Sequence, residues 1–107
     1  QAEKAFVEVK GVTLEENGVV KFPDAPTLRG VKHIEELCKA VSVGYKGYLV
    51  FIVQMNNVKH FTPNYATHPE FGNALKKAQA QGVKLLCLSC NVTPNSIKAQ
   101  KPVEIIL

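Results

Sequence analysis

The first third of the chain alternates apolar and polar side chains, and this alternation predicts β-strands. A strand is expected over residues 5–14 that ends or bulges around Gly11, because a glycine interrupts a run of β-branched and aromatic residues. A second run, residues 19–22, follows Asn17-Gly18, and both of these residues accept the positive φ of a tight hairpin. We expect the two strands to pair antiparallel, which would bring Asp24 towards the first strand.

Apolar residues three and four positions apart predict two helices. The first is expected to begin after an N-cap at Thr27 and to end near residue 43, before Gly44. The second has Pro69 in its first turn, where proline is tolerated, and ends at Gly82. The apolar stripe of each helix is expected to form its buried face.

The later strands are predicted from apolar runs. Residues 47–54 form a continuous apolar run, which is typical of a strand buried on both faces, and residues 83–92 predict a second central strand. Between them a loop is expected, with at most a short edge strand at residues 58–61, and a last edge strand is expected at residues 103–107. The order ββαβαββ predicts an α/β domain with a mixed central sheet flanked by helices.

Length and composition limit the classes of protein to consider. The 107 residues, 46% hydrophobic and 21% charged, predict one folded domain. No apolar run approaches the roughly 20 residues of a membrane span, so no membrane partner is expected and the predicted location is cytoplasmic. The net charge of +4 favours a polyanionic partner. Three cysteines predict reduced thiols, with Cys87 and Cys90 as buried structural side chains.

An acid and a base lie close together in the first predicted strand. Glu8 and Lys10 share one face of that strand, with Val7 and Val9 on the other. A carboxylate can bind a hard cation such as Mg²⁺, and a neighbouring ammonium can stabilise charge on a phosphate or orient an attacking water. The alternative interpretation is a solvated strand face, and the spacing alone favours it.

The first predicted helix carries a polar row beside its apolar stripe. Arg29, His33 and Glu36 lie three or four residues apart and therefore on one side of the helix. Arg29 adds positive charge near the helix N-terminus, where the helix dipole already favours anions such as phosphate. Such side chains are also commonly solvated or packed, and the sequence leaves both interpretations open.

Several sequence blocks together resemble the sugar fermentation stimulation protein (SfsA) family, over nearly all of the chain. The blocks are FVEVKGVTL, NGVVKFPDAPTLRGVKHIEEL, GYLVFIVQ, HPEFGNAL and GVKLLCLSCNV. The most specific of them is the FPDA-P-T-x-RG-x-KH pattern that follows the E-x-K strand. The resemblance implies a bacterial or archaeal protein that binds DNA without strong sequence preference and regulates sugar (maltose) utilisation. It also implies a restriction-endonuclease-like, PD-(D/E)xK core.

This resemblance implies roles for particular residues. Glu8 and Lys10 match the catalytic E-x-K element, and Mg²⁺ or Mn²⁺ would be held by Glu8, the carbonyl of Val9 and Asp24. In nucleases of this type an Asp on the preceding strand completes the metal site, and in the family an OB-like domain precedes the nuclease-like one. Neither is found in this sequence, so residues 1–107 are expected to be a single nuclease-like domain and a fragment of a longer protein.

Three functions follow as hypotheses. The first is a DNA-binding protein of nuclease-like fold, in which four side chains contact phosphates. These are Lys10, Arg29, Lys32 and His33. The alternative is an enzyme, a metal-dependent nuclease that uses Glu8, Lys10 and Asp24. The third is a scaffold or subunit whose hairpin pairs with another segment. The expected partners are DNA and either a second copy in a homodimer or the N-terminal segment of the same protein.

Overall fold

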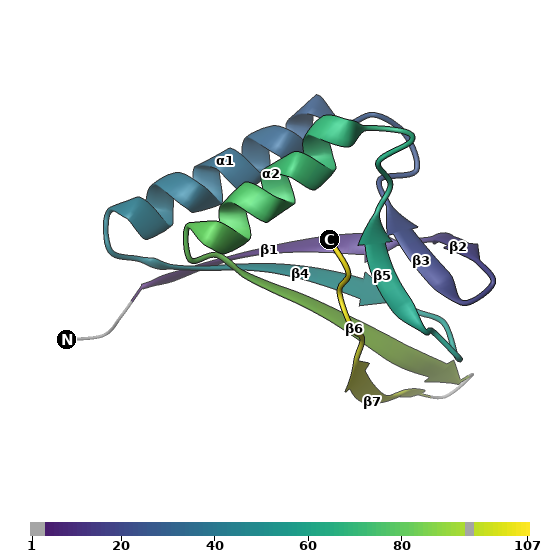
Figure 1. The fold of residues 1–107 in the computed structure, drawn as a ribbon. Coiled ribbons are helices and arrows are strands. Elements are labelled where there is room, and N and C mark those ends of the chain that lie inside the picture. Colours follow the sequence, from purple (N-terminus) through teal and green to yellow (C-terminus); the bar gives the residue numbers. More distant parts are fainter. Residues whose placement is uncertain (1–3, 94–95) are drawn as a thin grey trace.

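The computed structural model describes residues 4–93 and 96–107, and it contains two helices packed on strands (Figure 1). In chain order the elements are β1 (Ala5–Val12), β2 (Leu14–Glu16), β3 (Val19–Phe22), α1 (Leu28–Ser42), β4 (Lys46–Val53), β5 (His60–Pro63), α2 (Pro69–Ala80), β6 (Lys84–Thr93) and β7 (Ser96–Pro102). The predicted mixed α/β architecture is confirmed. The observed order is βββαββαββ. The predicted order ββαβαββ left out β2 and β5, although β5, an edge strand of the second sheet, overlaps the short edge strand allowed for at residues 58–61.

The main sheet has the strand order β1-β4-β6-β7. β1, β4 and β6 run parallel to one another, and β7 pairs antiparallel with β6. Val9 aligns with Val50 and Val50 with Leu86, so these three side chains share one face of the sheet. β1 is an edge strand of this sheet, with β4 as its partner on one side.

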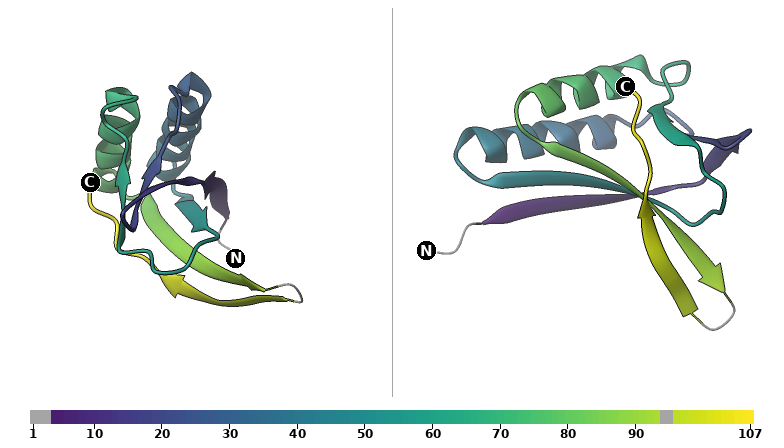
Figure 2. Two further views of the ribbon diagram at one scale, coloured as in Figure 1. Left: turned by 90° about the vertical axis from the view of Figure 1, so that its right-hand side faces the viewer. Right: turned by 60° about the horizontal axis from the view of Figure 1, so that its bottom comes forward.

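Both helices lie over the same face of the main sheet, as Figures 1 and 2 show. The hydroxyl oxygen of Thr27 accepts a hydrogen bond from the Gly30 N–H at 2.9 Å, which confirms the predicted N-cap of α1. The helix ends before Gly44, whose φ of +100° suits a residue without a side chain. Pro69 is in the first turn of α2, as predicted. None of the helices in the described residues is long and apolar enough to cross a membrane.

The first expected strand is two strands, and this corrects the prediction for residues 5–14. β1 pairs with β4 in regular register through Gly11 and Val12, so there is no bulge at Gly11; instead the strand ends at Val12, next to Gly11, which was the other possibility predicted. The chain then leaves the main sheet at Thr13 and forms a second sheet with the order β2-β3-β5. The predicted hairpin at Asn17-Gly18 is present, with φ angles of 53° and 86°, but it joins β3 to β2 and not to β1.

Two further expectations were wrong in part. β4 is not buried on both faces: its buried residues alternate with half-buried ones, and the buried side chains belong to the same core cluster as Ile34 and Leu37 of α1. The last strand is β7, and residues 103–107 instead lie between β5 and β6. There the Val103 N–H donates to the Cys87 carbonyl at 2.8 Å, and the Phe61 N–H donates to the Glu104 carbonyl at 2.8 Å. The sequence Thr93-Pro94-Asn95-Ser96 also predicts a turn, but residues 94–95 of it lie outside the described residues.

The hydrophobic core lies between the helices and the two sheets. Phe51 and Phe61 stack with their ring centroids 4.3 Å apart, and Phe71 from α2 is also fully buried. Phe22 packs against both Phe51 and Phe71. Cys87 is buried as predicted, and burial raises the pKa of its thiol to about 11. The core therefore fixes α1 and α2 over the main sheet, which places the side chains of α1 beside β1.

Candidate functional site

Glu8 and Lys10 lie on β1 at the edge of the main sheet, on the side that faces α1. The Lys10 Nζ atom is 3.6 Å from Oε1 of Glu8. The Lys10 side chain is only 14% exposed, whereas that of Glu8 is 35% exposed. Val9 between them points to the opposite face of the sheet and is 58% exposed. The two predicted catalytic side chains are therefore paired, and Lys10 is more enclosed than a solvated strand face would leave it.

His33 of α1 joins this pair. Its Nδ1 atom is 2.8 Å from Nζ of Lys10 and 3.4 Å from Oε1 of Glu8. An ammonium group has three donors and no acceptor, so Nδ1 must accept the hydrogen bond and the ring proton must be on Nε2. We call Glu8, Lys10 and His33 the β1–α1 cluster. It brings one carboxylate, one ammonium and one imidazole into mutual contact between β1 and α1.

The sequence indicated each member of this cluster but not their contact. Lys10 and His33 are 23 residues apart, and a hairpin separates them. The available signal was the buried stripe of α1: Ile34 and Leu37 face the core, which leaves His33 at the border of the buried face. That position predicts a helix residue close to the sheet, although not which strand residue it meets.

Two hollows open beside the β1–α1 cluster. One, of about 500 Å³, lies at the beginning of α1 and is lined by Leu28, Arg29, Lys32, His33 and Glu36. The other, of about 540 Å³, runs between β1 and α1; it includes Glu8, and Phe6 and Tyr45 form an edge-to-face pair in its wall. His33 and Glu36 line both hollows. Three of the predicted phosphate-contacting residues therefore line one hollow, and the fourth, Lys10, is hydrogen-bonded to His33.

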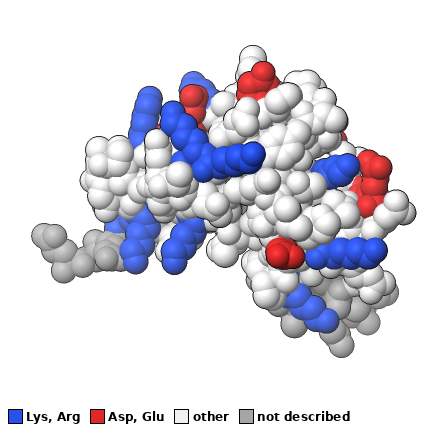
Figure 3. Space-filling model, in the orientation of Figure 1, with Lys and Arg blue, Asp and Glu red and all other residues white. Residues whose placement is uncertain are grey.

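Positive charge is not confined to this region. On the face drawn in Figure 3, Lys and Arg side chains gather over the two helices. A test of the site therefore needs a control lysine elsewhere on the molecule. Lys101 suits this purpose because it is exposed on β7, at the opposite edge of the main sheet from β1.

The beginning of α1 is held in place by the beginning of α2. The Thr27 N–H donates to Nδ1 of His68 at 3.1 Å, and Nε2 of His68 is 3.4 Å from Glu70. Asn64 adds a hydrogen bond from its side-chain amide to the carbonyl of Pro23 at 3.0 Å. His68 is the residue before α2, a position at which a side chain can cap the helix, but its side chain caps no amide of α2 and accepts from the N-cap residue of α1 instead. These bonds fix the turn from which Arg29 projects.

The predicted metal ligands are only partly brought together. Glu8 offers a half-exposed carboxylate, while Asp24 is exposed in the turn between β3 and α1. Among residues 4–93 and 96–107, no group of three or more His, Cys, Asp or Glu side chains could hold a metal ion. Asp24 therefore does not complete a site with Glu8 and His33. Glu8 fits a site of the kind that Mg²⁺ prefers, in which one or two carboxylates are supplemented by water and phosphate oxygens.

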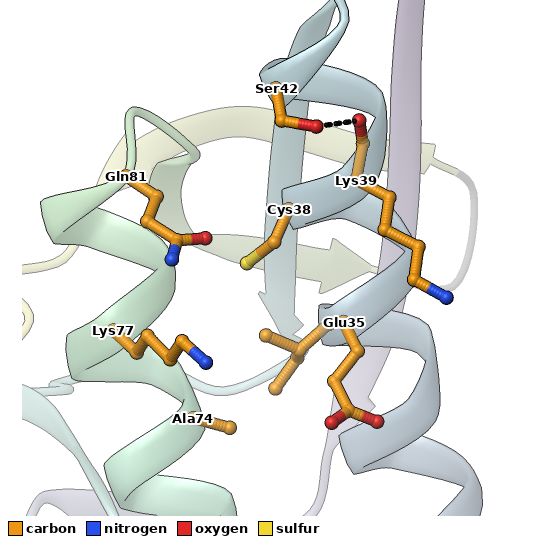
Figure 4. Close-up of a pocket in the computed structure, with 8 residues that line it drawn as sticks. Glu35, Cys38, Lys39, Ser42, Ala74, Lys77 and Gln81 are labelled. Carbon is orange, nitrogen blue, oxygen red and sulfur yellow. Dashed lines mark hydrogen bonds between the residues drawn. The ribbon is translucent and has the colours of Figure 1, made fainter.

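A separate groove lies between the outer surfaces of α1 and α2 (Figure 4). It has a volume of about 300 Å³, and the thiol of Cys38 faces Lys77 and Gln81 across it. Burial raises the pKa of the Cys38 thiol, and the nearby charge of Lys77 partly opposes this. Ser42 donates to the Lys39 carbonyl at 2.6 Å and so satisfies the end of α1. The raised pKa disfavours a reactive thiolate.

Comparison with known proteins identifies the family. The family model described as the sugar fermentation stimulation protein RE domain matches residues 1–96. A sugar fermentation stimulation protein homolog of Desulfitobacterium hafniense (strain Y51) is 62% identical over 96 residues, which are 90% of this chain and 42% of that protein. The homolog of Ruminiclostridium cellulolyticum is 53% identical over 105 residues, 98% of this chain and 46% of that protein.

A solved structure supports the same assignment. It is that of Pyrococcus furiosus SfsA in complex with Ca²⁺, which is 30% identical and matches with a TM-score of 0.88 over 96% of this chain and 45% of that one. The chain thus spans less than half the length of these relatives. Because the family model and the relatives cover about nine-tenths of the sequence or more, the chain belongs to the sugar fermentation stimulation protein (SfsA) family.

Proposed function

We propose that this chain forms the nuclease-like part, with a restriction-endonuclease-like PD-(D/E)xK core, of a DNA-binding protein with weak sequence preference. The protein would act in the regulation of sugar (maltose) utilisation. The observation that carries the proposal is that Arg29, Lys32 and His33 line one hollow, and that His33 is hydrogen-bonded to Lys10. Phosphate contacts of this kind position a duplex without reading its sequence.

The roles of the four side chains differ. Arg29 and Lys32 are exposed in the first turns of α1, where no acidic residue opposes them in the first turn and the helix dipole adds positive potential. Lys10 is more enclosed and would meet a phosphate only at the bottom of the site. His33 would contact a phosphate oxygen through its Nε2–H, because Nδ1 accepts from Lys10.

A binding assay over a series of salt concentrations tests this proposal. The intact protein, with any sequence that accompanies these 107 residues, is titrated into labelled duplex DNA of unrelated sequences. The logarithm of the affinity should fall linearly with the logarithm of the salt concentration, with a slope that decreases by about 1 for each phosphate contact removed. Lys32→Ala and Arg29→Ala should each lower the slope, whereas Lys101→Ala should not. Equal effects of Lys32→Ala and Lys101→Ala would refute the proposed interface.

The second candidate function is metal-dependent hydrolysis of phosphodiesters. It is favoured by the 3.6 Å contact of Glu8 with Lys10, together with the Ca²⁺ complex of the Pyrococcus furiosus relative. Glu8 would be one ligand of Mg²⁺ or Mn²⁺ and the carbonyl of Val9 a second, while Asp24, which lies apart from Glu8, would not be a ligand; water and phosphate oxygens would complete the coordination. The metal would supply a Lewis acid and a water of lowered pKa. Lys10, as a charged donor held beside Glu8, would stabilise negative charge on the phosphate.

Incubation of DNA with Mg²⁺ or Mn²⁺ separates the two functions. Cleavage by the wild-type protein that is lost in Glu8→Gln and Lys10→Ala, but kept in Lys101→Ala, is the result expected for a nuclease. Cleavage that Lys10→Ala leaves unchanged would exclude the β1–α1 cluster as its origin. DNA binding without cleavage under any of these conditions would leave the first function and reject the second.

A further inference from the structure

The face of the main sheet that points away from the helices is almost entirely apolar. Its side chains come from three neighbouring parallel strands and align across them in register. They are Val7 and Val9 of β1, Tyr48, Val50 and Ile52 of β4, and Leu86 and Leu88 of β6. Two exposed lysines lie at one end of this face, Lys46 at the beginning of β4 and Lys84 at the beginning of β6. We call this surface the open face of the sheet.

The open face is exposed to an extent that these side chains do not usually show. Val7 and Val9 are each 58% exposed and Leu86 is 42% exposed. By contrast, the residues of β4 whose side chains point to the other face, such as Leu49 and Phe51, are completely buried under the helices. In the described part of the chain both helices lie on the other side of the sheet (Figures 1 and 2). A contiguous apolar patch of this kind marks an interaction surface.

The strand directions indicate what kind of element covers the open face. A sheet with one wet face is normally antiparallel and carries polar residues on that face, whereas parallel strands occur almost only in sheets covered by helices on both faces. β1, β4 and β6 are parallel, and their outward residues are valine, isoleucine, leucine and tyrosine. The composition and the topology therefore both fit a second layer of helix, packed on the sheet opposite α1 and α2.

We propose that the open face is covered by an amphipathic helix from the part of the same polypeptide that lies outside these 107 residues. The relatives support this source, because the matched region is only 42–46% of their length and leaves more than half of each protein to supply the layer. The helix would bury Val9, Val50 and Leu86 at the centre of the face. This inference is independent of DNA binding and of nuclease activity.

Hydroxyl-radical labelling of the intact protein measures the exposure of these side chains directly. Leu86 and Leu28 have the same intrinsic reactivity, and their exposed fractions in this chain are 42% and 83%. With each rate normalised to that of the urea-unfolded protein, a free open face predicts that Leu86 is labelled about half as fast as Leu28. A covered face predicts labelling at least about ten times slower than in the unfolded protein, since a buried side chain is shielded from solvent. Labelling of Leu86 at half the rate of Leu28 would overturn the proposal.

A photoreactive amino acid in place of Val9 identifies what covers the face. The expected product has the mass of one polypeptide, and the captured peptide lies outside the 107 residues and has apolar residues three and four positions apart. Capture of a second polypeptide would overturn the proposal in favour of an interface between copies. The proposal would also be overturned if dilution of the protein halved its molar mass and at the same time removed the protection of Leu86 from labelling. A captured peptide with apolar residues two positions apart would overturn the helical identity of the cover.

Discussion

The contact between Lys10 and His33 makes a prediction that does not depend on any ligand. His33→Ala removes the acceptor of a 2.8 Å hydrogen bond from an ammonium group, and a hydrogen bond to a charged group contributes about 1.5–3 kcal/mol to stability. Lys10 keeps Glu8 at 3.6 Å, and both Lys10 and His33 are partly accessible to solvent, with side chains 14% and 22% exposed. Solvent therefore replaces part of the lost bond, and we expect a loss of about 1 kcal/mol.

The conservative variant separates the hydrogen bond from simple packing. Asparagine can place its Oδ1 atom close to the position of the histidine Nδ1, so His33→Asn should restore at least half of the stability lost in His33→Ala. In thermal unfolding of the intact protein, a loss of about 1 kcal/mol lowers Tm by about 2–4 °C for a chain of roughly 200 residues. Equal Tm values for the alanine and asparagine variants would show that Nδ1 does not accept from Lys10.

The tautomer of His33 gives a second measurement with no contribution from packing. The ¹⁵N shifts of the two ring nitrogens, recorded at pH 8, should show the proton on Nε2, because Nδ1 accepts from Lys10. Lys10→Met removes the donor and keeps most of the side-chain volume, so it should allow a mixture of the two tautomers. If the tautomer does not change in Lys10→Met, the proposed geometry of the β1–α1 cluster is incorrect.

Three further changes test how the fold supports the site. Thr27→Ala should cost about 1 kcal/mol by removing the cap of α1, whereas Thr27→Ser should cost much less; chemical denaturation measures both. Gly72→Ala should destabilise by roughly 1–3 kcal/mol, because its Cβ would overlap the ring of Tyr65. Gly11→Ala is the matched control, since no atom lies within 4 Å of the added Cβ, and it should be close to neutral in the same experiment. For Cys87, the pKa of the thiol is about 11 in the folded protein and 9.0 as the ordinary value, so the unfolded state loses its proton first. Stability should therefore fall between about pH 9 and pH 11, and Cys87→Ala should lack this part of the fall, as urea titrations across that range would reveal.

The helices could be predicted from sequence almost to the residue, because the signals at their ends are local. Thr27 caps α1 through its own hydroxyl, and Gly44 and Gly82 adopt the positive φ angles that follow a helix end. The hairpin at Asn17-Gly18 was predicted for the same reason. These features depend on residues within four positions of one another.

Strand partners depend on the whole chain, and there the prediction was incomplete. Gly11 indicated an interruption in the run of residues 5–14, but both halves have strand composition and no local signal shows that they join different sheets. The division follows from the parallel pairing of β1 with β4, which uses β1 up to Val12, and from the second sheet that β2 forms with β3. The site shows the same limit. Glu8 and Lys10 were predicted together, while the contact of Lys10 with His33 needed the position of α1 over β1.

One face of β1 contributes to the β1–α1 cluster and the other to the open face of the sheet. Because β1 is an edge strand, a change on one face is expected to affect the other. Glu8 and Lys10 face α1, whereas Val7 and Val9 belong to the open face, so these four consecutive residues contribute to both the cluster and the apolar surface. Within the main sheet β1 is hydrogen-bonded to one strand, β4, on one side. The stability of its backbone conformation therefore depends strongly on what packs against its two faces. An element that covers Val7 and Val9 would hold the backbone from which Glu8 and Lys10 project. The geometry of the β1–α1 cluster and the cover of the open face are therefore expected to be thermodynamically coupled.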